Sequence, residues 1–174
     1  MLLGLLLMTS PSLLLTDFTS NSADLGWYVV NDNVMGGRSE GGFEQEEGEL
    51  RFTGRTNTNG GGFSSIRSQP AQLDLSNYTG IELKIRGDGR RYTWRLTTEA
   101  RWRGKQISYW ADFETRDGTW TTVNIPFGDF IPRYRGYQLE GAALDAAKIT
   151  GMGLMIYDNE DGPFELQLTS VHAF

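Results

Sequence analysis

Alternation of apolar and polar residues is the feature that most constrains how this chain folds. The clearest case is residues 81–86, where isoleucine or leucine occupies every second position. A period of two places these side chains on one face of a β-strand, against a core. The same pattern, or an apolar run of strand length, recurs at 49–53, 92–97, 107–113, 120–125, 151–157 and 164–169. Because turn residues separate these segments, the sequence predicts an all-β sandwich or barrel.

The chain is expected to form a single domain over residues 13–174, with a first strand at 13–18. The turn Gly87-Asp88-Gly89 predicts a hairpin between 81–86 and 92–97. Helix signals are scarce, and only 141–149 is long enough for two helical turns.

Residues 1–12 are predicted to be an apolar leader or a frayed segment. The run from Met1 to Leu15 lacks the basic residue that usually begins a secretory signal. It is also too short to span a membrane, and Pro11 interrupts it. It leaves two locations open: cytoplasmic, attached at most peripherally to a membrane, or exported if the run is a degraded signal.

The composition argues against most catalysis. The chain has no cysteine and one histidine, His172, which excludes disulfides and thiol chemistry and disfavours histidine-based metal sites. Three strand glutamates, Glu82, Glu114 and Glu165, could face a cleft, but their spacing singles out no pair. We therefore expect a protein that is not an enzyme and that binds no cofactor.

Charge is unevenly distributed. The net charge of −6 predicts that nucleic acid is not the main partner, yet residues 84–105 hold eight basic and two acidic residues. Arg91 and Trp94 lie in this basic, aromatic window. It fits a solvated sheet face with arginines over aromatic rings, or a surface for a protein, carbohydrate or single-stranded nucleic acid.

Residues 27–39 form the segment richest in turn signals. Asn31, Asp32 and Asn33 favour turns, and Gly36-Gly37 allows positive φ. The segment is either a structural loop or a recognition loop. In the second case Asp32 would fix its geometry and Met35 would be an adaptable apolar contact.

Residues 59–67 contain three consecutive glycines before Phe63. The Gly-Lys-Ser/Thr of a phosphate-binding loop is absent, so we expect Gly62 and Phe63 to enter a strand, with Arg67 paired or exposed.

The acidic stretch 158–162 resembles a calcium loop but lacks EF-hand spacing. A turn is expected, with a structural calcium as the alternative.

Taken in order, these motifs resemble the complex I intermediate-associated protein family of the thirty-kilodalton type. The matching segments contain Asn-Asp, Met-Gly-Gly-Arg-Ser, Gly-Gly-Phe, Arg-Gly-Asp-Gly-Arg and Ile-Pro-Phe motifs, and they lie at 27–39, 48–54, 59–67, 74–81, 86–92, 120–130 and 162–164. The resemblance extends from about Leu15 to the C-terminus. One departure is Ser64, where many relatives carry alanine.

The resemblance implies a galactose-binding-like jelly-roll β-sandwich with little helix, and a non-enzymatic role in assembling respiratory complex I or a photosynthetic complex. Because the chain shows no arginine-rich leader and no fused domain, we expect a stand-alone bacterial member that binds protein subunits of a membrane-associated complex. A carbohydrate-binding module is the alternative. The expected contact residues are Asp32, Met35, Gly36, Gly37, Ser39, Gly62, Phe63, Arg67, Arg91 and Trp94.

Overall fold

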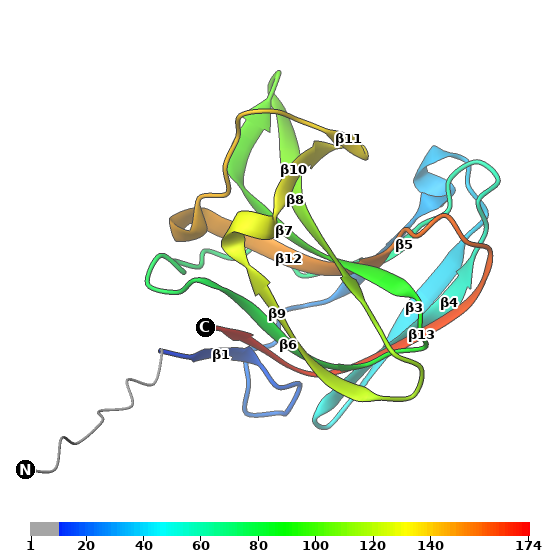
Figure 1. Cartoon of the computed structure of the whole chain (residues 1–174), viewed down its shortest axis with the longest axis horizontal. Helices are drawn as coiled ribbons and strands as arrows, with labels where there is room; N and C mark the ends of the chain where they lie inside the picture. Colours follow the sequence, from blue (N-terminus) through cyan, green and yellow to red (C-terminus); the bar gives the residue numbers. More distant parts are fainter. Residues whose placement is uncertain (1–10) are drawn as a thin grey trace, which may run out of the picture.

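A computed structural model describes residues 11–174 and shows two antiparallel β-sheets packed face to face (Figure 1). One sheet contains, in spatial order, β3 (Glu40–Glu46), β4 (Glu49–Thr56), β13 (Gly162–Ala173), β6 (Gly80–Arg86) and β9 (Trp120–Pro126), with β1 (Leu13–Thr16) paired to the end of β13. The other contains β11 (Tyr137–Gln138), β10 (Ile131–Tyr134), β8 (Lys105–Glu114), β7 (Arg91–Trp102), β12 (Ile149–Ile156), β5 (Ser64–Arg67) and β2 (Tyr28–Asn31). The predicted all-β jelly-roll sandwich is confirmed.

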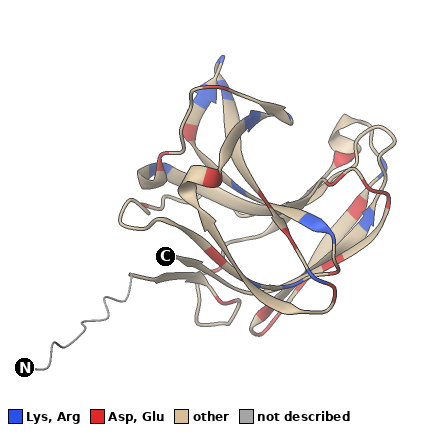
Figure 2. Cartoon of the chain, in the orientation of Figure 1, with Lys and Arg blue, Asp and Glu red and all other residues tan. Residues whose placement is uncertain are grey.

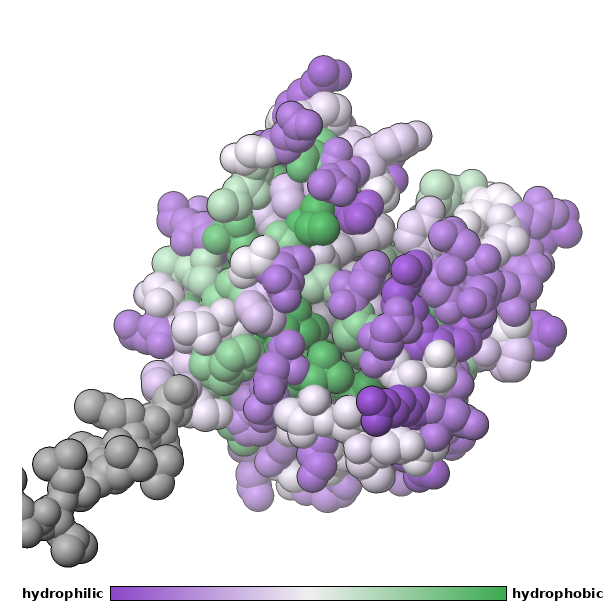
Figure 3. All heavy atoms as spheres, in the orientation of Figure 1, coloured by the Kyte–Doolittle hydropathy of each residue, from purple (hydrophilic) through white to green (hydrophobic). Residues whose placement is uncertain are grey.

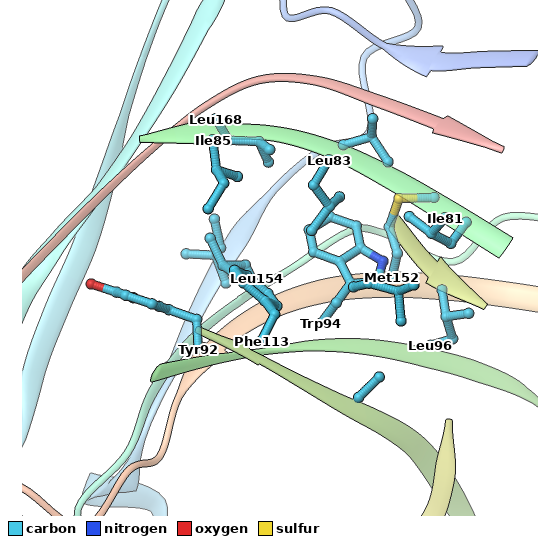
Figure 4. Packing of buried hydrophobic residues seen from close by; sticks show 14 of the residues in the cluster. Ile81, Leu83, Ile85, Tyr92, Trp94, Leu96, Phe113, Met152, Leu154 and Leu168 are labelled. Carbon is cyan, nitrogen blue, oxygen red and sulfur yellow. The ribbon is translucent and has the colours of Figure 1, made fainter. Parts of the chain in front are cut away.

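The core lies between the sheets and follows the alternation read from the sequence. Ile81, Leu83 and Ile85 of β6 are fully buried and face Trp94 and Leu96 of β7 (Figure 4). Each such side chain contributes roughly 1.5–3 kcal/mol by leaving water. The intervening residues of β7 therefore point to the opposite, outer face of the seven-stranded sheet.

The hairpin predicted between 81–86 and 92–97 is wrong. Strand β6 pairs with β13 and β9, whereas β7 pairs with β8 and β12 in the other sheet. The turn between them crosses from one sheet to the other, and Asp88 joins the two. Its Oδ2 accepts hydrogen bonds from the hydroxyl of Tyr92 (3.0 Å) and from the backbone N–H of Glu165 on β13 (2.8 Å).

Helical structure is limited to single 3₁₀ turns within residues 11–174: η1 (Asp32–Met35), η2 (Phe127–Asp129) and η3 (Ala146–Lys148). The two helical turns expected at 141–149 are reduced to η3. Asp145 caps this turn by accepting from the N–H of Ala147 (3.1 Å), and Ile149 already pairs with Leu73 as a strand residue.

The first strand, β1, begins at Leu13 as predicted and ends at Thr16, two residues earlier than expected. The predicted leader, 1–12, lies almost entirely outside the described residues.

Candidate functional site

Asp32 joins the two glycine-rich segments that the sequence singled out. Its carboxylate is buried and accepts from the N–H (2.9 Å) and hydroxyl (2.6 Å) of Ser39, and from the N–H groups of Gly62 (2.6 Å) and Phe63 (3.3 Å). Burial alone would raise the pKa of Asp32, but these hydrogen bonds together outweigh it and lower the pKa. The carboxylate is therefore a charged internal clamp between η1 and the approach to β5.

Two glycines make room for this clamp. A Cβ atom on Gly61 would lie 2.6 Å from Asp32, and one on Gly37 would overlap the carboxylate itself. Gly36 adopts φ 85° and ends η1. The clamped loop leaves Val34 and Met35 exposed, at 72% and 61% of their surface.

A row of residues crosses the outer face of the seven-stranded sheet. Strand register places these residues side by side from β10 to β2: Ile131, Trp110, Arg95, Gly153, Arg67 and Tyr28. Paired residues of antiparallel strands point to the same face. Because their sequence neighbours Trp94, Tyr109 and Leu154 are buried in the core, the row points away from it.

Four residues of this row line a groove: Trp110, Arg95, Arg67 and Tyr28. One hollow of about 490 Å³ lies between η1, which supplies Met35, and the β10–β11 turn, which supplies Arg135. A second hollow of about 480 Å³ continues past Tyr28, and the two share Arg67 and Arg95 in the middle. Figure 3 shows the corresponding notch between the arm built from β7, β8 and β10 and the lobe that carries η1.

The groove is strongly basic. Its lining contains a single acidic residue, Glu99, and five arginines: Arg67, Arg95, Arg101, Arg133 and Arg135. Figure 2 shows further basic residues at the tip of the β7–β8 hairpin, above the groove. In a chain of net charge −6, this is a local reversal of sign.

Arg95 is the most deeply placed of these arginines, with 9% of its surface exposed. Its Nε has no hydrogen-bond partner within residues 11–174. Burial, assisted by the neighbouring charge of Arg67, lowers the pKa of Arg95 to about 9. Burial also lowers the pKa of Arg67, whose Nε donates to the hydroxyl of Ser65 (3.3 Å).

Aromatic side chains stand beside the arginines. The guanidinium of Arg133 lies 5.3 Å from the ring centre of Trp110, and Tyr157 meets the same ring edge-on at 6.1 Å. Phe63 packs against Tyr157 at 6.4 Å. The groove therefore offers partly exposed ring surface as well as positive charge.

The structure separates the predicted contact residues into three groups. Met35, Phe63 and Arg67 line the groove. Asp32, Gly36, Gly37, Ser39 and Gly62 build the clamped loop beside it.

The remaining two predicted residues lie elsewhere. Arg91 is near Asp112 (4.0 Å) and is not among the lining residues. The prediction for Trp94 is corrected, because this side chain is fully buried in the core and offers no surface to a partner.

Sequence reasoning missed Arg95, Trp110 and Tyr28 as groove residues. The available signal was strand phase. Arg95 alternates with buried Trp94 and Leu96, and Trp110 alternates in the same way with buried neighbours on β8. Phase assigns both to the outer face, whereas residue type alone drew attention to Trp94.

The acidic loop 158–162 surrounds an arginine. Both carboxylate oxygens of Asp158 accept from Arg90 (2.7 and 2.9 Å), which also donates to the carbonyls of Glu160, Gly162 and Pro163. The acidic loop therefore binds a guanidinium of the same chain.

The three strand glutamates do not converge. Glu165 binds Arg51 through both carboxylate oxygens (3.1 and 2.9 Å). Glu82 lies opposite His172 in the strand register. His172 is seven residues beyond Glu165 on β13, which places Glu82 about 23 Å from Glu165 along the sheet. Glu114 belongs to the other sheet. No group of three metal-ligating residues occurs in the described part of the chain, and none of its helices is long and apolar enough to cross a membrane.

The fold and the groove together define a two-sheet β-sandwich with a ligand-sized depression on the outer face of one sheet. The model of the complex I intermediate-associated protein 30 family matches residues 16–168. The chain belongs to this family.

Relatives extend the match. An uncharacterized protein of Schizosaccharomyces pombe is 31% identical over 172 residues, which cover 83% of this chain and 76% of that protein. The mitochondrial complex I intermediate-associated protein 30 of Mus musculus is 28% identical over 85% of this chain. The chain spans about half of the mouse protein, 52% of its length.

Among solved structures, the family 11 carbohydrate-binding module of Clostridium thermocellum, in complex with a mixed-linked tetrasaccharide, has a TM-score of 0.65 at 18% identity. The match covers 94% of this chain and 95% of that module. An agarase matches with a TM-score of 0.63 at 13% identity, through 24% of its own length. These likenesses show the fold.

Proposed function

We propose that this protein is a non-enzymatic binding module that assists the assembly of a membrane-associated electron-transport complex, respiratory or photosynthetic. Family membership supports the class of role, since the mouse relative is named for its association with complex I intermediates. We further propose that it acts in the cytoplasm and meets the membrane only through its partner.

The make-up of the groove is the observation that carries the proposal. Its lining includes Val34, Met35 and Tyr157, which are exposed at 72%, 61% and 37% of their surface. Exposed methionine and aromatic side chains around a basic floor are typical of protein interfaces, which are enriched in methionine, tyrosine and arginine. On the face seen in Figure 3, the lobe over β3 and β4 is largely hydrophilic by contrast.

Affinity purification from the native host, with and without mild detergent and read by mass spectrometry, tests the proposal. We expect subunits of an electron-transport complex, and we expect Met35→Asp to abolish their enrichment. The matched control is Trp120→Ser on β9, which removes an exposed apolar side chain from the other sheet. If the wild type captures no such subunit under either condition, the proposed function fails.

A second candidate function is carbohydrate binding, which the ring surface of Trp110, Tyr157 and Tyr28 favours. The flat C–H faces of sugars stack on such rings, and binding clefts are rich in aromatic side chains. A glycan array with wild type and Trp110→Ala tests this candidate. Wild-type binding that Trp110→Ala removes would support it, and an array without binding would remove it.

A further inference from the structure

Two arginines meet at the centre of the groove without a counter-charge. Arg95 and Arg67 flank Gly153 in the strand register. A Cβ on Gly153 would lie 2.9 and 3.0 Å from Cγ and Cδ of Arg95, so the stem of Arg95 lies across this glycine. The charges of Arg95 and Arg67 are close enough for Arg67 to depress the pKa of Arg95. Neither arginine has a carboxylate within 4.0 Å among residues 11–174.

Arg90 shows how the same fold treats an arginine with a structural role. Its side chain is also mostly buried, at 11% exposure, but Asp158 pairs with it at 2.7 Å. Three carbonyls and the hydroxyl of Thr56 accept its remaining hydrogen bonds. Arg95 has none of these partners, and its buried Nε is unsatisfied. A buried cation without partners is costly, so its retention on the floor of an open groove points to a ligand.

The shape and charge of the site indicate which ligand. A guanidinium presents a planar fork of donors that matches a carboxylate. The groove lining carries five arginines and one glutamate, which complements an acidic partner. The rim at Val34, Met35 and Tyr157 lies beside this charge and suits neighbouring apolar side chains of a peptide.

We propose that Arg95 and Arg67 form an anion site that binds a side-chain carboxylate of an acidic segment in the protein partner. The identity of the partner as a protein rests on the proposed function, whereas the anion site rests on the arginine pair alone. The clamped loop at Asp32 would hold the apolar rim next to the bound carboxylate.

Titration calorimetry with hexaglutamate tests the site, with hexaglutamine and trigalacturonate as comparison probes at matched salt. We expect hexaglutamate to bind and hexaglutamine not to bind. Arg95→Gln or Arg67→Gln should weaken hexaglutamate binding at least tenfold. Arg51→Gln, which makes the same charge change on the other sheet, should alter it less than twofold.

Several results would overturn the proposal. Absence of hexaglutamate binding refutes the site, and equal weakening by Arg51→Gln reduces it to net-charge attraction. Binding of trigalacturonate in place of hexaglutamate refutes the peptide assignment. Circular dichroism of each variant confirms folding, and Arg67→Gln, at a half-buried position, is the safer variant in this respect.

The two proposals fail separately. If hexaglutamate binds at Arg95 but the pull-down contains no electron-transport subunit, the assembly role falls and the anion site stands. If the subunits are captured equally well by wild type and Arg95→Gln, the anion site falls and the assembly role stands.

Discussion

Replacing Arg95 by methionine should stabilise the protein in the absence of a ligand. Methionine keeps the length of the stem that crosses Gly153 and removes the charge that has no partner. Burial lowers the pKa of Arg95 to about 9, and this shift from the ordinary value of an arginine corresponds to an upper limit of about 5 kcal/mol. Replacing buried charges by apolar side chains of similar volume has stabilised other proteins by about 1–4 kcal/mol, so we expect about 2 kcal/mol.

Thermal unfolding at pH 7 measures this gain. For a chain of this size, about 2 kcal/mol corresponds to a rise of about 4–8 °C in the unfolding midpoint. The arginine is charged in both folded and unfolded chains at pH 7, so the full penalty is present there. Above pH 9 the folded state releases its proton first, so the advantage of Arg95→Met should shrink as the pH rises further.

A control separates this effect from a general loss of positive charge. Arg51→Met removes an exposed arginine that pairs with Glu165, and its midpoint should stay close to that of wild type, since exposed ion pairs contribute little to stability. A midpoint for Arg95→Met below that of wild type would mean that the guanidinium has stabilising partners, and the reasoning about the groove floor would fail.

Substitutions at three further positions test the loop clamp, the groove floor and the contrast with Arg90. Asp32→Ala should lower the free energy of unfolding by about 3 kcal/mol in urea, because it leaves buried donors without an acceptor. Because the pKa of Asp32 is lowered in the folded state, the stabilisation by its carboxylate is present above pH 3.8 and is lost as the pH falls through the folded-state pKa. The difference in the free energy of unfolding between wild type and Asp32→Asn should therefore close in acid titrations. Gly153→Ala would place a Cβ 2.7 Å from a backbone carbonyl oxygen and push Arg95 aside, which should destabilise by about 1–3 kcal/mol in the same urea assay and weaken hexaglutamate binding. Arg90→Met should cost about 3–5 kcal/mol in thermal unfolding, because it strands the buried carboxylate of Asp158; a cost below about 1 kcal/mol would contradict the contrast with Arg95.

Most of the strands could be predicted because alternation is a local property. Ile81, Leu83 and Ile85 are buried as their spacing indicates, whatever strand lies beside them. Strand pairing is not local. The turn at Gly87-Asp88-Gly89 suits a hairpin equally well, but Asp88 instead binds groups from both sheets, and only the tertiary fold supplies those partners.

The groove was predictable in part. Turn chemistry identified the loop around Asp32 and Met35, and the basic window included Arg95. Trp94 was chosen for its residue type, although its phase along β7 matches that of the core. The meeting of Arg95 with Arg67 depends on the order β7-β12-β5, which joins segments that are far apart in the chain.

Site-specific photo-crosslinking in the native host tests the central claim most directly. A photoreactive residue placed at Met35 or Tyr157 reports on the groove rim, and one at Trp120 reports on the other sheet. We expect residues at Met35 and Tyr157 to crosslink to the same subunit of an electron-transport complex, and a residue at Trp120 not to crosslink to it. Crosslinks from Trp120 alone would show that the partner binds the other sheet and would contradict the account.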